Sequence, residues 1–229
     1  MPRMNMESDP RSELIETGRD FHRRGWSLAT SSNYSVVVCR DPLRIVLTGS
    51  GFDKGRLTRD QFVEVDREGS VVDASGLRPS AETWLHVVLA RSGGAGAVLH
   101  THSVWGTLLS RAAESAGSIE IGGFEMLKAL SGVVTHQHVE RIRVFPNTQD
   151  IASLAAEVEA CLRHPDQPLR HGFLIAGHGL YAWGRDLPEA RRHVEAIEFL
   201  LELVGLGVMA RTGGGPAFGQ GSACDPVQT

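Results

Sequence analysis

Two short β-rich runs near the start of the chain are separated by a turn that is too short to contain a helix. They are residues 35–40 (SVVVCR) and 44–48 (RIVLT), with Asp41-Pro42 between them. Strands joined this closely pair antiparallel, because a parallel pair needs a crossover of about a dozen residues or more. A second pair, 62–66 and 70–73, alternates across another short turn. The spacing therefore predicts a sheet that is largely antiparallel.

Helical patterns lie between further strands. Helices are expected from Ser12, from a cap at Ser80 to about Arg91, over 125–130, from a cap at Asp150, and from near Pro188. Buried strands are expected at 96–102, 141–145, 172–176 and 179–183. The mixture predicts an α+β domain. It disfavours a doubly wound nucleotide-binding fold, because no GxGxxG follows a strand and TGSGFDKG does not match GxxxxGK[ST].

The 229 residues are enough for one large domain. We assign 12–211 to a single catalytic domain, 1–11 to a flexible N-terminal arm, and 212–229, rich in Gly and Pro, to a disordered tail. Apolar residues of the last helix recur in steps of four and three, which indicates a packing stripe suited to a neighbouring subunit. The members of this stripe are Ala190, Val194, Ile197, Leu201 and Val204.

Composition excludes several classes of protein. The net charge is −4 with both signs scattered, whereas a nucleic-acid-binding surface would show clustered Lys and Arg. No apolar run approaches the roughly 20 residues that span a bilayer, and the polar start shows no secretory signal. The three cysteines, Cys39, Cys161 and Cys224, are far apart and odd in number, which favours reduced thiols in a cytoplasmic protein.

Two histidines end the buried run AVLHTHS. His100 and His102 are two apart on a strand, so their side chains share a face about 6–7 Å apart at the backbone. His178 ends another apolar run between two glycines and is the best third partner. Three imidazoles on one ion leave an open coordination position, which is typical of catalytic zinc.

Other interpretations of the histidines stay open. A lone HxH pair is more often structural than metal-binding, and His136 with His138 forms a competing pair in a polar setting, which we place in a loop or strand entry. The remaining histidines are most simply surface or packing residues. They are His22, His86, His164, His171 and His193.

Two glutamates and three loops are candidates for binding or proton transfer. Glu125 in GGFEMLKAL and Glu82 each lie near a helix start, where a solvated glutamate is ordinary. The loops are 30–35 (TSSNYS), 48–55 (TGSGFDKG, with Lys54) and 78–82 (RPSAE). Each is an ordinary turn alone, but together with a metal site they suggest a phosphorylated substrate, because loop and helix-start N–H groups bind anions.

The segments GWSLATSSNYS, SGFDKGRL, RPSAET, AVLHTHS, FEMLKAL and HGLYAWGRD occur in an order and spacing that resemble the class II aldolase superfamily. The similarity runs from about Ser12 to Val204. It implies α/β/α layers, with a mostly antiparallel sheet between helices, and a homotetramer with sites near subunit interfaces.

The resemblance also implies roles for particular residues. His100, His102 and His178 would bind one zinc ion per subunit, with manganese or iron as alternatives, and Glu125 would be the catalytic acid/base. The residues that match the substrate site are Asn33, Ser50, Gly51 and Ser80 in a phosphate cradle, Lys54 close by, and Glu82 near the metal. Burial beside the site is expected to raise the pKa of Glu125.

The FEMLKAL segment points more narrowly to the branch of the superfamily that dehydrates a ketose phosphate. The expected reaction is zinc-dependent conversion of 5-methylthioribulose 1-phosphate to 5-methylthio-2,3-dioxopentyl phosphate in methionine salvage. The alternatives are a sugar-phosphate aldolase or epimerase and, from another class, a non-catalytic interaction domain. One departure concerns Ser32, which stands where the family pattern has Gly, so a positive φ there would be strained.

Overall fold

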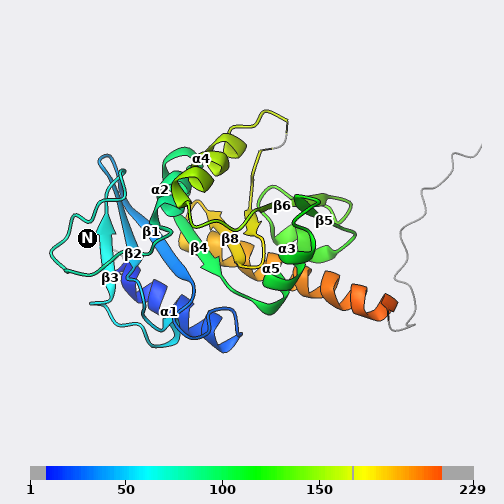
Figure 1. Cartoon of the computed structure of the whole chain (residues 1–229), viewed down its shortest axis with the longest axis horizontal. Helices are drawn as coiled ribbons and strands as arrows, with labels where there is room; N and C mark the ends of the chain where they lie inside the picture. Colours follow the sequence, from blue (N-terminus) through cyan, green and yellow to red (C-terminus); the bar gives the residue numbers. More distant parts are fainter. Residues whose placement is uncertain (1–8, 167, 213–229) are drawn as a thin grey trace, which may run out of the picture.

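The computed structural model describes residues 9–166 and 168–212, and the sheet at its centre has eight strands in the order β3-β2-β1-β4-β8-β7-β6-β5 (Figure 1). The strands are β1 (Asn33–Arg40), β2 (Leu43–Thr48), β3 (Phe62–Val65), β4 (Ala97–Thr101), β5 (Ser118–Gly122), β6 (Val139–Phe145), β7 (Gly172–Ile175) and β8 (Gly179–Gly184). Neighbouring strands pair antiparallel except β6 and β7. The predicted, mostly antiparallel α+β sheet is confirmed.

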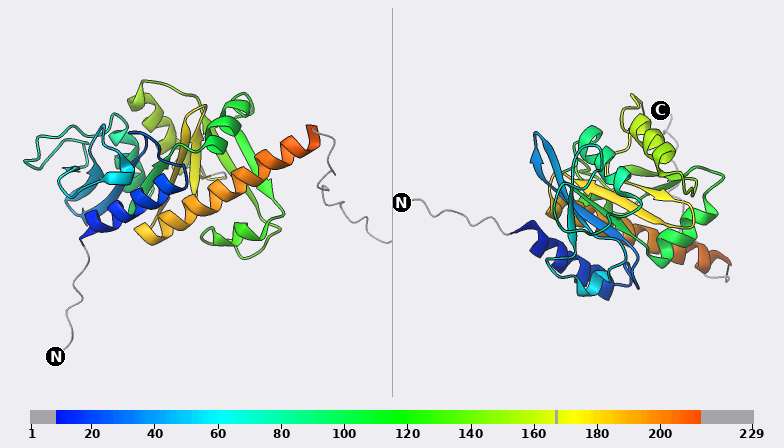
Figure 2. Two further views of the ribbon diagram at one scale, coloured as in Figure 1. Left: turned by 90° about the horizontal axis from the view of Figure 1, so that it is seen from below. Right: turned by 60° about the vertical axis from the view of Figure 1, so that its left-hand side comes forward.

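Helices cover both faces of this sheet and give the expected three layers. They are α1 (Pro10–Arg23), α2 (Thr83–Ser92), α3 (Val104–Ala112), α4 (Ile151–Leu162) and α5 (Leu187–Thr212), with short 3₁₀ helices η1 (Lys54–Arg56) and η2 (Glu125–Ala129). Helices α2 and α4 pack together on one face, whereas α1, α3 and α5 lie on the other (Figure 2). The long α5 crosses the sheet and contacts β4, β7 and β8.

The two ends of the strands carry different loops. At one end, β4 stops at Thr101 beside the start of β8, and β1 starts at Asn33, which pairs with His100; we call this the histidine end. At the other, β5 stops at Gly122 opposite Val139, the first residue of β6. Because η2 follows β5 directly, we call this the η2 end. The antiparallel register thus separates the AVLHTHS and FEMLKAL motifs by the length of the sheet.

Several predicted boundaries shift. Helix α1 begins at Pro10, so 10–11 do not belong to an arm, while 1–8 and 213–229 lie outside the described residues. Helix α2 begins at Thr83 rather than after a cap at Ser80. The second member of the 62–73 hairpin is only a bridge between Val65 and Val71.

The apolar stripe of α5 was assigned wrongly to a neighbouring subunit. Ala190, Val194, Ile197 and Leu201 are fully buried in this chain's own core, and Val204 packs against the same cluster. The steps of four and three arise because one face of α5 packs on the sheet. An α-helix needs apolar residues at this spacing whether its apolar face packs on a sheet or on a partner helix. Among the described residues, the helices are too short or too polar to span a bilayer.

Candidate metal centre and active site

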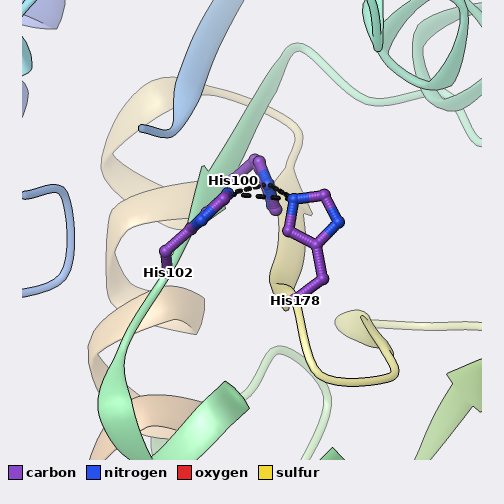
Figure 3. A group of neighbouring side chains, drawn as sticks. All are labelled: His100, His102 and His178. Carbon is purple, nitrogen blue, oxygen red and sulfur yellow. Dashed lines mark hydrogen bonds between the residues drawn. The ribbon is translucent and has the colours of Figure 1, made fainter. Parts of the chain in front are cut away.

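Three imidazoles from two strand ends meet at the histidine end (Figure 3). His100 and His102 lie at the end of β4, and His178 lies in the turn between β7 and β8. The Nε2 atoms are 2.7 Å apart for His100 and His102, 3.1 Å for His102 and His178, and 3.4 Å for His100 and His178. The sequence-predicted triad is therefore brought together around one point.

Neighbouring groups orient the first of these rings. His100 Nδ1 donates to the carbonyl of Leu180 at 2.9 Å, which leaves the Nε2 lone pair facing the other two rings. The ring of Tyr181 stacks on that of His100, with centroids 4.1 Å apart. Thr101, between the two histidines, points to the opposite face and donates to Glu198 of α5 at 2.5 Å. Burial raises the pKa of Glu198 to about 7.

The glycines that flank His178 have separate geometric reasons. Gly177 has a φ of +63°, a conformation that glycine adopts at no steric cost. At Gly179 an added Cβ would lie 2.0 Å from the carbonyl oxygen of Thr101, so no larger residue lets β8 approach β4 this closely. The apolar run and its glycines together place the third imidazole beside the other two.

The triad suits a bound divalent cation. Nitrogens that bind a tetrahedral zinc ion at about 2.05 Å stand about 3.3 Å from one another, close to the 3.1 and 3.4 Å distances from His178, while His100 and His102 lie closer together at 2.7 Å. Burial, followed by the neighbouring imidazoles, holds the pKa of His100 well below its usual value, and burial lowers that of His102 to about 4. Both rings are therefore neutral at pH 7, the form that binds metals. Converging lone pairs repel unless a cation lies between them.

A buried polar chain aims a carboxylate at the triad. Glu82 lies 3.5 Å from Nε2 of both His100 and His178. The amide of Asn33 donates to Glu82 at 2.8 Å, and its carbonyl accepts from Nε2 of His86. Because the carboxylate of Glu82 can only accept, it fixes the direction of the Asn33 amide, and the ring of His86, whose pKa burial lowers to about 3, is neutral with its one N–H on Nε2.

The three loops chosen from the sequence line one cavity of about 420 Å³ together with His102 and His178. They contribute 30–33, 49–51 with Lys54, and 80–82. Lys54 is almost fully buried, and its ammonium donates to the carbonyls of Phe52 at 2.7 Å and Thr30 at 3.4 Å. Burial lowers the pKa of Lys54 to about 8. Asn33, Ser50, Gly51, Ser80 and Glu82 all reach this cavity.

The strain expected at Ser32 is present. Its φ is +71°, in the left-handed region that favours glycine, and its hydroxyl donates to the carbonyl of Trp26 at 3.3 Å. The loop thus keeps the shape that a glycine would give it, at some cost in free energy.

Sequence reasoning missed two contributors. Residues 147–149 line the same cavity, and the signal for them is the NTQ turn after 141–145, since β6 runs parallel to β4 and therefore ends at the same edge of the sheet. His86 was classed with surface or packing histidines, but it is fully buried and hydrogen-bonded to Ser35 and Asn33. The sequence around His86 is that of an ordinary helix, so nothing in it distinguishes His86 from a histidine that only packs in the core.

Glu125 is not brought to the triad within one chain. It lies on η2, at the other end of the sheet and four strands from β4, a lateral separation of about 19 Å. Its side chain is 70% exposed and pairs with Lys128 at 2.6 Å and His136 at 3.2 Å. The expectation of burial is wrong for the single chain: Lys128 foremost, with His136, lowers the pKa of Glu125.

Comparison with known proteins identifies the family. The model of the class II aldolase and adducin N-terminal domain matches residues 12–204. The chain belongs to this family. It is 47% identical over 191 residues to a methylthioribulose-1-phosphate dehydratase of Marinobacter nauticus, covering 82% of this chain and 89% of that protein. A relative of the same name from Sorangium cellulosum is 48% identical over 193 residues, with 83% and 89% covered.

The fold also occurs in solved structures. An L-fuculose 1-phosphate aldolase superposes with a TM-score of 0.73 at 23% sequence identity, covering 92% of this chain and 90% of that one. At this identity the likeness concerns the fold alone. The resemblance seen in the sequence motifs, to the superfamily and to its dehydrating branch, is confirmed by these comparisons.

Proposed function

We propose that the protein is a hydro-lyase that converts 5-methylthioribulose 1-phosphate to 5-methylthio-2,3-dioxopentyl phosphate in methionine salvage. The observation that carries the proposal is one cavity lined both by two histidines of the triad, His102 and His178, and by three loops rich in hydroxyl and N–H groups. Relatives named for this dehydration align over most of the chain. With a metal ion on the histidines, the cavity would offer both an electrophilic centre and a phosphate cradle, which a phosphorylated ketose requires.

The phosphate would lie among the loops at the mouth of the cavity. Gly51 offers a backbone N–H group, Ser50 and Ser80 offer hydroxyls, and Lys54 offers an ammonium, whereas the N–H of Ser50 already donates to the carbonyl of Arg78. Binding of the phosphate at one end of the substrate holds the other end in place beside the triad. Such positioning lowers the activation free energy, because the reacting groups no longer have to be brought together. Glu82, held by Asn33, borders the triad and orients the substrate oxygens there.

His100, His102 and His178 would hold a zinc ion, because three imidazole ligands suit zinc and leave a coordination position open. When bound, the ion would supply Lewis acidity that stabilises negative charge on the oxygens of the substrate. The rest of the reaction is proton transfer. The C3 proton is removed, the C4 hydroxyl leaves as water with a proton from an acid, and the resulting enol tautomerises to the diketone.

Glu125 is the group proposed to transfer these protons, and it would act in the site of a second subunit. The η2 end of one chain cannot reach its own histidine end, but an exposed carboxylate on a loop can enter a neighbour's cavity. Exposed apolar side chains on α3 and α5 favour self-association, and a homotetramer is the assembly that we propose. They are Val104, Leu108, Leu206 and Met209.

Incubation with 5-methylthioribulose 1-phosphate, followed by mass spectrometry, tests the activity. The expected product is lighter than the substrate by one water molecule. Cleavage to an aldehyde with no loss of water would assign an aldolase instead. Recovery of unchanged substrate from metal-loaded protein would contradict an enzymatic role on this compound.

A further inference from the structure

Ser131 follows η2, and each of its polar atoms has a hydrogen-bond partner. His193 Nε2 accepts from its backbone N–H at 3.2 Å, and His171 Nε2 donates to its carbonyl at 2.8 Å. Its hydroxyl donates to Glu189 at 2.5 Å and accepts from Arg192 at 2.9 Å. We call Ser131 with these four partners the Ser131 clasp.

The clasp connects the segment from η2 to Ser131, which we call the η2 loop, to the sheet and to α5. Nδ1 of His171, next to the start of β7, also lies 2.9 Å from a carboxylate oxygen of Glu140 on β6. His193 on α5 donates from Nδ1 to the carbonyl of Trp183 in β8 at 2.6 Å. Both ring nitrogens of each histidine are therefore in use, and the loop is fixed to three separate elements.

These polar groups lie in the interior. Glu140, His171, Glu189 and His193 are 6%, 4%, 8% and 2% exposed. Burying such groups is unfavourable unless all are paired, and a fully paired network specifies one geometry. Hydrogen bonds, first that from the Ser131 hydroxyl, lower the pKa of Glu189 to about 2, so it accepts as a carboxylate.

Apolar contact alone would keep the loop on the protein. Leu127 and Leu130 are fully buried on either side of the last turn of η2. Apolar burial is non-directional, however, whereas the clasp fixes orientation. Arg192 extends it by donating from Nε to the carbonyl of Ala129, the last residue of η2, at 2.8 Å. The rigid part therefore reaches to within four residues of Glu125.

We propose that the Ser131 clasp is a positioning device that sets where Glu125 enters the active site of a neighbouring subunit. Arg192 and His193 are its positioning residues. They touch neither substrate nor the triad and act through the η2 loop. The inference rests on the proposed function, in which Glu125 serves the site of another chain.

The first test uses two variants and a matched control. Arg192→Ala removes a half-exposed side chain and should fold, whereas His193→Leu removes the buried acceptor of the Ser131 N–H. Arg191→Ala is the control, because Arg191 neighbours Arg192 in the sequence but pairs with Asp20 of α1 and not with the η2 loop. We expect kcat to fall about 10-fold for Arg192→Ala and about 100-fold for His193→Leu, with KM and metal content unchanged. Arg191→Ala should keep full kcat.

The second test asks which end of the active site each variant damages. Chains carrying different tags are co-expressed, and mixed assemblies are isolated. Mixing Glu125→Gln chains with His178→Ala chains should restore about a quarter of wild-type turnover, the share of sites that receive both intact parts by random pairing. His193→Leu chains should regain activity with His178→Ala chains and gain none with Glu125→Gln chains.

The outcomes separate the two claims. If the mixture of Glu125→Gln and His178→Ala stays inactive, the two-chain site is overturned, and the positioning role with it. If that mixture is active but His193→Leu is rescued by Glu125→Gln chains, only the clasp is overturned. Equal loss of kcat in Arg191→Ala and Arg192→Ala would also overturn the clasp, because a general effect on α5 would then explain both.

Discussion

The histidine end and the η2 end of the sheet both use buried histidines to hold a loop, yet they leave their glutamates in opposite situations. At the histidine end, His86 and Asn33 direct Glu82, which is 13% exposed, at three converging imidazoles. At the η2 end, the Ser131 clasp supports a loop whose Glu125 is 70% exposed and faces no ligand within the chain. The histidine end holds its carboxylate within a cluster of imidazoles, whereas the η2 end presents its carboxylate to solvent.

The largest effect is expected from removing a metal ligand at the histidine end, because only this end of the sheet is proposed to bind a metal. His178→Ala should lose the bound cation and reduce turnover by more than roughly 10⁴-fold, a loss beyond that of one acid/base group. Metal analysis of purified protein measures it, with His164→Ala, an exposed histidine, as the control. A full complement of metal in His178→Ala would break the comparison, because the triad would not be the ligand set.

Glu125→Gln should reduce kcat by about 10²–10⁴-fold while leaving the metal in place, because it removes a proton donor and keeps the shape of the side chain. Steady-state kinetics alongside metal analysis checks both halves. Glu120→Gln, on the adjacent strand β5, is the matched control and should be fully active. A wild-type kcat in Glu125→Gln would contradict the proposal that the η2 end takes part in the chemistry.

A smaller effect, on KM, tests whether Lys54 binds the phosphate of the substrate. Since the pKa of Lys54 is lowered to about 8, its ammonium is present below that pH and is lost above it. KM for the phosphorylated ketose should therefore rise as pH passes about 8, with kcat less affected. Lys54→Met should show a raised KM that no longer changes over this range. An unchanged KM in that variant would exclude Lys54 from phosphate binding.

The smallest effect concerns Ser32. Replacement by Gly relieves a left-handed residue and gives up one hydroxyl contact, so the free energy of unfolding should change by about 1 kcal/mol or less. KM should fall by a few-fold, on the order of 1 kcal/mol in binding. Chemical denaturation and kinetics measure the two quantities. Ser31→Gly, where φ is not positive, should lower stability without improving KM.

Much of the histidine end could be predicted because local patterns fix it. Strand alternation sets His100 and His102 on one face, and the glycines around His178 mark a tight turn. The strain at Ser32 could be predicted because the family pattern has glycine at this position of the loop, where serine is strained at a positive φ. Each depends on neighbours in sequence or on a single strand pair.

The remainder depends on interactions between distant parts of the chain, or between chains. His86, His171 and His193 look like packing residues, because nothing local shows that Asn33 or Ser131 will lie beside them. The stripe of α5 was misassigned because a sheet and a partner helix select the same period. Burial of Glu125 could not be judged from one chain, since the surface that it would enter belongs to another.

The most direct test of the account is a crystal structure of the metal-loaded assembly, with anomalous scattering to locate the ion. The account predicts one metal ion among Nε2 of His100, His102 and His178, with the carboxylate of the partner subunit's Glu125 facing the same cavity. A metal-loaded assembly in which Glu125 of every chain faces solvent, far from any ion, would contradict it.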